Sequence, residues 1–162
     1  MRNPMDKIAF EIETTNLEDY LTTKIFINGY DLRERVAQIE FEELYRKIGQ
    51  RPLQTPAYEG LPPFIAFHLN NHFCGDTINE YRYPGGRLAL LEYVFSGVPG
   101  DHTLTCRIDL EPDRVIWTDF KLFSKVIPME PVYDRLRFEF DRNQYMAEVE
   151  DLKITRLNPI YT

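Results

Sequence analysis

The sequence lacks a complete catalytic or cofactor-binding motif. No serine stands in a nucleophile elbow, and Pro84-Gly-Gly-Arg87 lacks the spacing and the Lys-Ser/Thr pair of a phosphate-binding loop, so a turn is expected there. No apolar run approaches the roughly 18 residues that span a membrane, and the amino terminus has no apolar stretch typical of a secretory signal. These absences predict a cytoplasmic protein without a cofactor and favour a non-enzymatic function.

Cysteine and basic residues are also scarce. The two cysteines, Cys74 and Cys106, allow at most one disulfide and exclude a disulfide-stapled fold. The 19 Lys and Arg residues are outnumbered by 26 Asp and Glu residues, so the formal net charge is −7. A negative chain disfavours binding to nucleic acid or to an anionic membrane. The charge is compatible instead with a basic protein partner.

Apolar and aromatic residues are in good supply. With 43% hydrophobic and 14% aromatic content, the 162 residues are enough to bury a substantial core in one domain, residues 1–162. The proline-rich segment 50–63 is expected to be a connection rather than a strand. Alternating or β-branched runs predict strands near 8–12, 24–28, 87–95 and 137–140.

Two helices are predicted, one near each end of the chain. Asp31 and Glu34 have the spacing of a capping box before an apolar stripe, and this helix either continues to about Ile48 or bends near Glu40. The same capping spacing recurs at the start of the segment 141–149. Helices outside a run of strands joined by short turns predict an α+β fold with an antiparallel meander and two main helices.

The centre of the chain, Leu104–Phe123, is predicted to form a hairpin with a turn around Pro112. Apolar and polar residues alternate in its first strand, and β-branched and aromatic residues dominate the second. With a three-residue loop, Leu104 faces Leu122 and Asp109 faces the single tryptophan, Trp117. Uninterrupted alternation then places one apolar face on the core.

The opposite face of this hairpin carries the candidate binding residues. The register places Trp117, Asp119, Arg107 and Asp109 there, and the carboxylate of Glu92 in the preceding strand is expected to join them. A tryptophan beside a carboxylate on an outer face is typical of a platform for a ligand or partner, and paired carboxylates suit acid–base chemistry. Two plainer alternatives are a helix that covers the face and a simple ion pair between Arg107 and Asp119.

The nearest approach to a metal site is the set His68, His72 and Cys74. Two histidines four residues apart on a helix share a face and are able to bind one ion, but the intervening asparagines argue against a regular helix. Surface or capping histidines are therefore favoured, and no metal is predicted. Asp101 next to His102 resembles a general base with an orienting carboxylate, although the stretch is more typical of a turn.

Four short stretches occur in the same order as similar stretches in a group of short, functionally uncharacterised bacterial proteins. They are Asn28-Gly-Tyr-Asp-Leu32, Glu59-Gly-Leu-Pro-Pro63, Val115-Ile-Trp-Thr-Asp-Phe120 and Phe140-Asp-Arg-Asn-Gln-Tyr145. The chain resembles that group over most of its length, and the resemblance implies a bacterial, intracellular protein but no particular activity. Many members carry a cysteine cluster before the central hairpin. The corresponding segment here, 92–102, has no cysteine, so no metal is expected there.

The leading hypothesis is a soluble, non-enzymatic protein-binding module. One concrete version is an acidic immunity-type protein that neutralises a basic toxin, because opposite charges speed association. The alternative is a small-ligand-binding protein or an enzyme with a pocket near Trp117 and Asp119.

Overall fold

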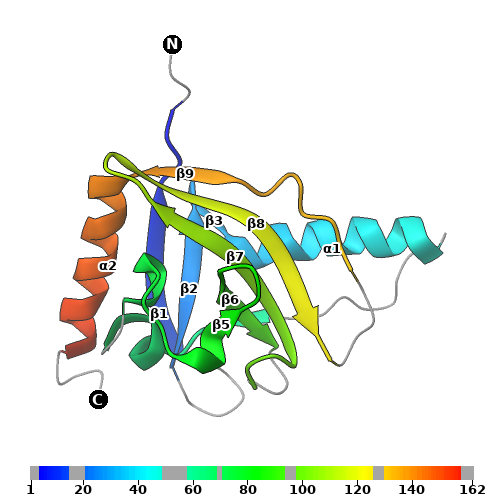
Figure 1. Ribbon diagram of the computed structural model, residues 1–162, viewed down its shortest axis with the longest axis horizontal. Helices are drawn as coiled ribbons and strands as arrows, with labels where there is room; N and C mark the ends of the chain where they lie inside the picture. The colour runs from blue at the N-terminus through cyan, green and yellow to red at the C-terminus, as the bar shows by residue number, and fades with distance from the viewer. Residues whose placement is uncertain are drawn as a thin grey trace.

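The structure is a computed structural model that describes residues 4–14, 21–48, 58–68, 71–93, 98–125 and 130–157 (Figure 1). It confirms the α+β class, with antiparallel sheets and two main helices. The strands are β1 (Ile8–Thr14), β2 (Leu21–Ile27), β3 (Tyr30–Asp31), β4 (Tyr58–Gly60), β5 (Arg82–Tyr83), β6 (Arg87–Tyr93), β7 (His102–Leu110), β8 (Arg114–Ser124) and β9 (Phe138–Asp141). The helices are α1 (Leu32–Ile48) and α2 (Arg142–Leu157), with short helical turns η1 (Phe64–His68), η2 (His72–Cys74) and η3 (Asn79–Tyr81). Neither the two helices nor the short helical turns among these described residues have the length and apolar content of a membrane span.

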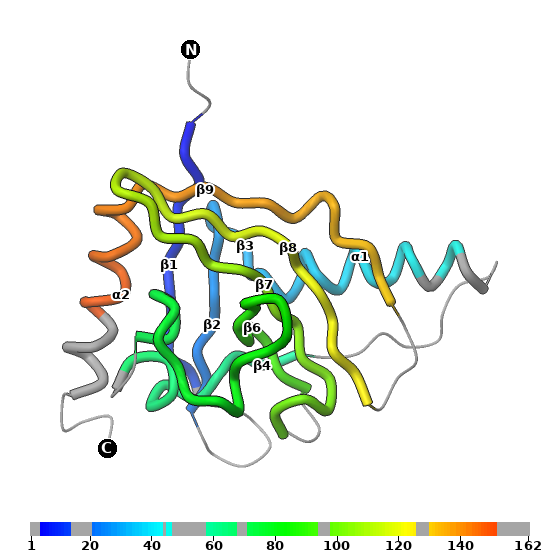
Figure 2. The backbone as a smooth tube through the Cα atoms, in the orientation of Figure 1, coloured from blue at the N-terminus to red at the C-terminus, as the bar shows by residue number. Residues whose placement is uncertain are grey.

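The strands form two antiparallel sheets. One has the order β1-β2-β3, and the other has the order β4-β6-β7-β8-β9, with β5 paired to β6. Because β6, β7 and β8 are consecutive neighbours, the predicted meander is confirmed. The larger sheet curls into a half-barrel against β1 and β2 (Figures 1 and 2).

Two contacts join the edges of these sheets. At one edge Asp6 forms a bridge to Phe140 of β9. At the other, the Thr23 N–H of β2 donates to the backbone oxygen of Leu61 at 2.8 Å. This approach requires Gly60, because a Cβ atom there would lie 1.6 Å from the Thr23 carbonyl oxygen. The two sheets therefore enclose a core between their inner faces.

The core draws on both sheets, both helices and the short helical turns. Its largest fully buried side chains include Ile8, Ile25, Leu32, Phe67, Phe73, Leu90, Leu104, Trp117, Phe140 and Tyr145. A smaller apolar cluster lies on the outer side of β6 and consists of Leu61, Ile65, Tyr81 and Ala89. The larger sheet is thus covered on both faces over part of its length.

Both helix starts are capped by the predicted aspartates. Asp31 Oδ1 accepts the backbone N–H of Arg33 at 2.9 Å, and Asp141 Oδ2 accepts that of Gln144 at 3.0 Å. The side chain of Gln144 exchanges two hydrogen bonds with the backbone of Ile8 in β1, at 3.2 and 2.7 Å. It therefore fixes α2 against the small sheet.

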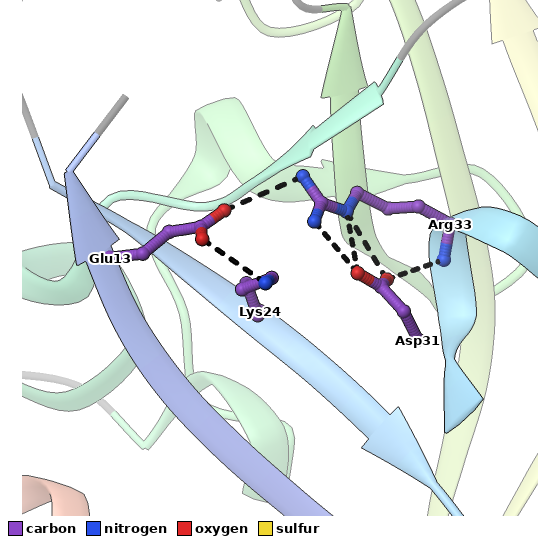
Figure 3. A network of polar contacts seen from close by, with 4 residues as sticks. All are labelled: Glu13, Lys24, Asp31 and Arg33. Carbon is purple, nitrogen blue, oxygen red and sulfur yellow. Dashed lines mark hydrogen bonds and ion pairs between the residues drawn. The ribbon is translucent and has the colours of Figure 1, made fainter. Parts of the chain in front are cut away.

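A polar network fastens the start of α1 to the small sheet (Figure 3). Arg33 pairs with Asp31 at 2.7 Å and with Glu13 at 3.6 Å, and Lys24 pairs with Glu13 at 3.1 Å. The four residues come from β1, β2, β3 and α1. The contacts hold the helix beside the strand pair that precedes it.

Two details of the sequence interpretation change. Helix α1 is continuous over Leu32–Ile48, so the alternative of a bend near Glu40 is wrong. Residues Tyr58–Gly60, expected to lie in a connection, form β4 instead. They pair with β6 at the edge of the larger sheet. The preceding segment 51–57 and the predicted strand end near residue 95 lie outside the described residues.

The register of the central hairpin changes along its length. Beyond a β-bulge, Leu104 pairs with Leu122, as the alternation predicts. Between the bulge and the turn, Trp117 pairs with Ile108, because the loop holds two residues, Pro112 and Asp113, and the Glu111 N–H donates to the backbone oxygen of Arg114 at 2.8 Å. The predicted three-residue loop is therefore wrong, and so is the prediction that Asp109 faces Trp117. A slip of one residue moves every side chain of that segment to the other face.

The bulge lies at Asp119. Its φ of 53° is in the left-handed region, which aspartate tolerates better than most non-glycine residues. One extra residue in β8 shifts the alternation, so Trp117 and Ser124 both lie on the inner face despite their odd separation in sequence. The bulge therefore decides which side chains of β8 meet inside the half-barrel.

Candidate functional site

The five predicted binding residues do not gather in one place. Trp117 is fully buried on the inner face, where its indole N–H donates to the hydroxyl of Tyr145 in α2 at 3.2 Å. Its predicted place on the outer face is wrong, because the loop of the hairpin has two residues instead of the predicted three, which pairs Trp117 with Ile108 of the inner face. The helix α2 contacts Trp117 from the inner side, whereas Arg107 and Asp119 on the outer face are exposed, so the alternative in which a helix covers that face is not what the structure has. Trp117 and Asp119 lie on opposite sides of the sheet and do not line a common pocket.

Arg107, Asp109 and Asp119 do share the outer face. Arg107 lies 3.5 Å from the carboxylate of Asp119 and 3.6 Å from that of Asp109. The cross-strand ion pair suggested by the sequence is therefore present. Arg87 of β6 also donates to the backbone oxygen of Asp119, at 2.9 Å. These contacts support the bulge, and binding of a partner by this cluster stays a prediction.

Glu92, the fifth predicted residue, lies at the other end of the sheet. It is 2% exposed and pairs directly with Glu59 of β4, so the carboxylate beside it is not one from the hairpin. Thr103 Oγ1 donates to Glu92 Oε2 at 2.6 Å. Burial, followed by the charges of Glu59 and Asp101, raises the pKa of Glu92 to about 8 against the opposing hydrogen bond from Thr103.

His72 is a buried structural residue. Its Nδ1 lies 2.7 Å from Thr77 Oγ1, and its Nε2 lies 2.6 Å from a backbone oxygen of β6. Burial lowers its pKa to about 4. Both nitrogens are engaged, so the favoured surface interpretation is wrong and a role as metal ligand requires breaking these bonds. The side chain of His68 lies outside the described residues. Within the described part of the chain, no group of three or more His, Cys, Asp or Glu side chains is placed to hold a metal ion.

The sequence did not predict a row of polar side chains at the open end of the inner face, away from the hairpin turn. The row crosses four strands and consists of Tyr58 of β4, Tyr93 of β6, His102 of β7 and Ser124 of β8. Glu40 of α1 and Tyr133 of the segment before β9 contact it from the side of the core.

A continuous chain of hydrogen bonds links Ser124 to Glu40. Ser124 Oγ lies 2.8 Å from His102 Nδ1, and His102 Nε2 lies 2.9 Å from the Tyr58 hydroxyl. Tyr58 donates to Glu40 Oε1, which also accepts from Tyr133 at 2.9 Å. Glu40, Tyr58 and His102 are buried, whereas Ser124 is half-buried at the end of β8. The chain runs from a buried carboxylate to a hydroxyl near the surface.

The number of available protons fixes which group donates and which accepts in each hydrogen bond of this chain. Tyr58 has one hydroxyl proton, which it donates to Glu40, so His102 Nε2 must donate to the Tyr58 oxygen. Burial lowers the pKa of His102 to about 4, so its ring is neutral near pH 7. Nδ1 is then an acceptor for the Ser124 hydroxyl at 2.8 Å, and the backbone oxygen of Asp101 at 3.4 Å is a second, more distant acceptor for the same proton.

Glu40 is a buried carboxylate with incomplete partners. It is fully buried, and its Oε2 has no hydrogen-bond partner among the described side chains. Burial raises the pKa of Glu40 to about 7, although the hydrogen bonds from Tyr58 and Tyr133 oppose this shift. A carboxyl group that titrates near neutrality in a hydrogen-bonded relay has the properties of an acid–base site.

The sequence singled out His102 as a possible base but suggested the wrong partner. The neighbouring Asp101 contributes its backbone oxygen, 3.4 Å from Ser124 Oγ, and the acid at the end of the chain is Glu40. No local spacing signals this set, because its members come from α1, β4, β7 and β8. Only the topology brings them together.

A separate surface follows the outward side of α1. Tyr30 precedes the helix and is 72% exposed, and Tyr45 near its end is 50% exposed. One hollow of about 340 Å³ adjoins Tyr30, and a second hollow adjoins Tyr45. Figure 1 shows the second half of α1 extending beyond the strands. We call this the α1 surface; it comprises Tyr30, Glu34, Arg35, Gln38, Phe41, Glu42, Tyr45 and Arg46.

Comparison of the chain with protein-family models, with curated proteins and with solved structures finds no match. Functional conclusions therefore rest on the chemistry of its own residues.

Proposed function

We propose that this chain is a cytoplasmic, non-enzymatic protein-binding module that binds a basic protein through the α1 surface. The observation that carries the proposal is the pair of exposed tyrosines, Tyr30 just before α1 and Tyr45 near its end. Tyrosine is enriched in protein interfaces because it offers a large rigid apolar area with a polar tip. The hollows beside each ring offer space for partner side chains.

The net charge of −7 supports the choice of partner. A negative field attracts a basic protein and raises the association rate, and it repels nucleic acid. The α1 surface itself carries charges of both signs, including Glu34 and Arg35. Its contribution is therefore contact area, whereas the whole chain supplies the attraction. An immunity-type protein that blocks a basic toxin is one concrete form of this function.

The test is capture of proteins from a native lysate of the source cells by wild-type protein and by single variants. Tyr30→Ala and Tyr45→Ala should each weaken retention of one basic protein by about tenfold or more, the effect of losing an interface anchor. Phe64→Ala is the matched control, because Phe64 is an aromatic residue of similar exposure, 52%, on another element. It should retain the partner as wild type does.

The salt dependence of capture gives a second readout. Retention should fall as ionic strength rises, because salt screens the attraction between the acidic chain and a basic partner. Recovery of no protein partner, together with a monomer at micromolar concentration, would contradict the proposal. Equal retention by wild type and both tyrosine variants would exclude the α1 surface as the contact.

A further inference from the structure

The hydrogen-bond chain that ends at Ser124 has the parts of an activated nucleophile. A serine hydroxyl attacks an electrophile when a base within hydrogen-bond distance accepts its proton and a third group orients that base. His102 Nδ1 lies 2.8 Å from Ser124 Oγ, and Tyr58 holds the other ring nitrogen at 2.9 Å. Tyr58 is tied in turn to Glu40, which in its ionised form stabilises the positive charge that develops on the imidazole.

The two groups differ in depth, because the base His102 is fully buried and the nucleophile Ser124 is half-buried. His102 is fully buried, and its ring lies 5.3 Å from that of Tyr58 and 5.6 Å from that of Tyr93. These rings restrict the rotation of the imidazole. Ser124 is the last residue of β8 and is half-buried, so it lies closer to solvent than its base does. The α1 surface uses none of these groups.

We propose that Ser124 is a nucleophile that is acylated by small esters. Its Oγ attacks the carbonyl carbon while its proton passes to His102 Nδ1. The bond to the alkoxide leaving group then breaks, and that oxygen takes the proton from His102. The products are an acyl ester of Ser124 and one molecule of alcohol, so atoms and charge balance. This chemistry goes beyond the binding of a protein partner and does not depend on it.

An alkyl fluorophosphonate tests the site, because it forms a phosphonyl ester with an activated serine as the P–F bond breaks and fluoride leaves. The chain contains two serines, Ser96 and Ser124, so Ser96→Ala is a matched control. Wild type and Ser96→Ala should gain one phosphonyl group on Ser124, measured by intact mass and peptide fragmentation. Ser124→Ala should gain none.

A variant that removes the group orienting His102 tests whether Ser124 is activated or merely exposed. Tyr58→Phe keeps the ring but cuts the link between His102 and Glu40, and it should react roughly 10- to 100-fold more slowly, the rate equivalent of losing one hydrogen bond to a group that becomes charged. Urea denaturation of the same variant shows whether it is folded. Wild-type protein labelled in urea should lose the selectivity for Ser124, because the hydrogen-bond chain exists only in the fold.

Three outcomes would overturn the proposal. They are no reaction of Ser124 in folded wild-type protein, equal rates for wild type and folded Tyr58→Phe, and equal labelling of Ser124 in native and urea-unfolded protein. If Ser124→Ala does not fold, the labelled position in wild type still decides, because fragmentation distinguishes Ser124 from Ser96.

Discussion

The inner face of the β7–β8 hairpin changes character along its length. Near the turn, Trp117 packs among the rings of Phe73, Phe140 and Tyr145, with centroid distances of 6.1, 5.4 and 6.2 Å. The polar atoms there have partners, since the indole N–H donates to Tyr145 and the Tyr145 hydroxyl donates to the backbone oxygen of Phe73 at 2.5 Å. This end of the face combines a large apolar contact with satisfied hydrogen bonds.

The open end of the same two strands is built differently. His102 and Ser124 belong to the chain that leads to Glu40, and one carboxylate oxygen of Glu40 has no partner among the described side chains. Glu92, on the outer side of the sheet, also has one such oxygen. Buried carboxyl groups with missing partners lower stability. The turn end therefore stabilises the fold, whereas the open end keeps titratable groups that suit chemistry better than stability.

Of the substitutions at the two ends of the hairpin, removal of Trp117 should change the free energy of unfolding most. Trp117→Ala leaves a cavity among three aromatic rings and should lower the free energy of unfolding by roughly 3–5 kcal/mol. Equilibrium urea denaturation followed by circular dichroism measures it. Trp117→Phe keeps an apolar ring and should cost clearly less. A loss below about 1 kcal/mol for the alanine variant would mean that the turn end is not the stabilising one.

Removal of the ionisable group at Glu40 should raise the free energy of unfolding near neutral pH, whereas removal of Trp117 lowers it. Burial raises the folded-state pKa of Glu40 to about 7 from an ordinary value of 4.5. The folded protein then binds this proton more tightly, so the stability that the group contributes is full below pH 4.5 and is lost as the pH rises to about 7. At about 1.4 kcal/mol per pKa unit, the loss is roughly 3 kcal/mol. Glu40→Gln stays neutral and should not show it.

Urea denaturation across this pH window measures the difference between the two proteins. The wild-type curve should fall relative to Glu40→Gln between pH 4.5 and about 7. Glu92→Gln should behave in the same way up to pH about 8. Glu130 is exposed, so Glu130→Gln is the control and should leave the pH dependence unchanged. Parallel curves for wild type and Glu40→Gln would contradict the buried-carboxyl interpretation.

The two ends of the hairpin also differ in how well the sequence predicts them. The predicted pairing of Leu104 with Leu122 is correct, but only because the one-residue bulge in β8 offsets the error of one residue in the predicted loop length. Nearer the turn the predicted three-residue loop places Trp117 on the wrong face, because the residues Glu111-Pro-Asp-Arg114 do not show whether the loop has two or three residues. The link from His102 to Glu40 was missed for another reason. The contact depends on how α1 lies against the sheet, and no local pattern contains that information.

Substitutions at Asp119 should change the free energy of unfolding least. They test what holds the bulge that places both Trp117 and Ser124 on the inner face. At φ 53°, valine should cost roughly 1–2 kcal/mol in free energy of unfolding, whereas glycine adopts this backbone without strain. Both Asp119→Val and Asp119→Gly remove the ion pair with Arg107, so the difference between them in urea denaturation isolates the backbone term. Equal stabilities would mean that the left-handed residue does not hold the bulge. The support would then come from Arg87, whose guanidinium donates to the backbone oxygen at 2.9 Å and would do so whichever side chain stood at this position.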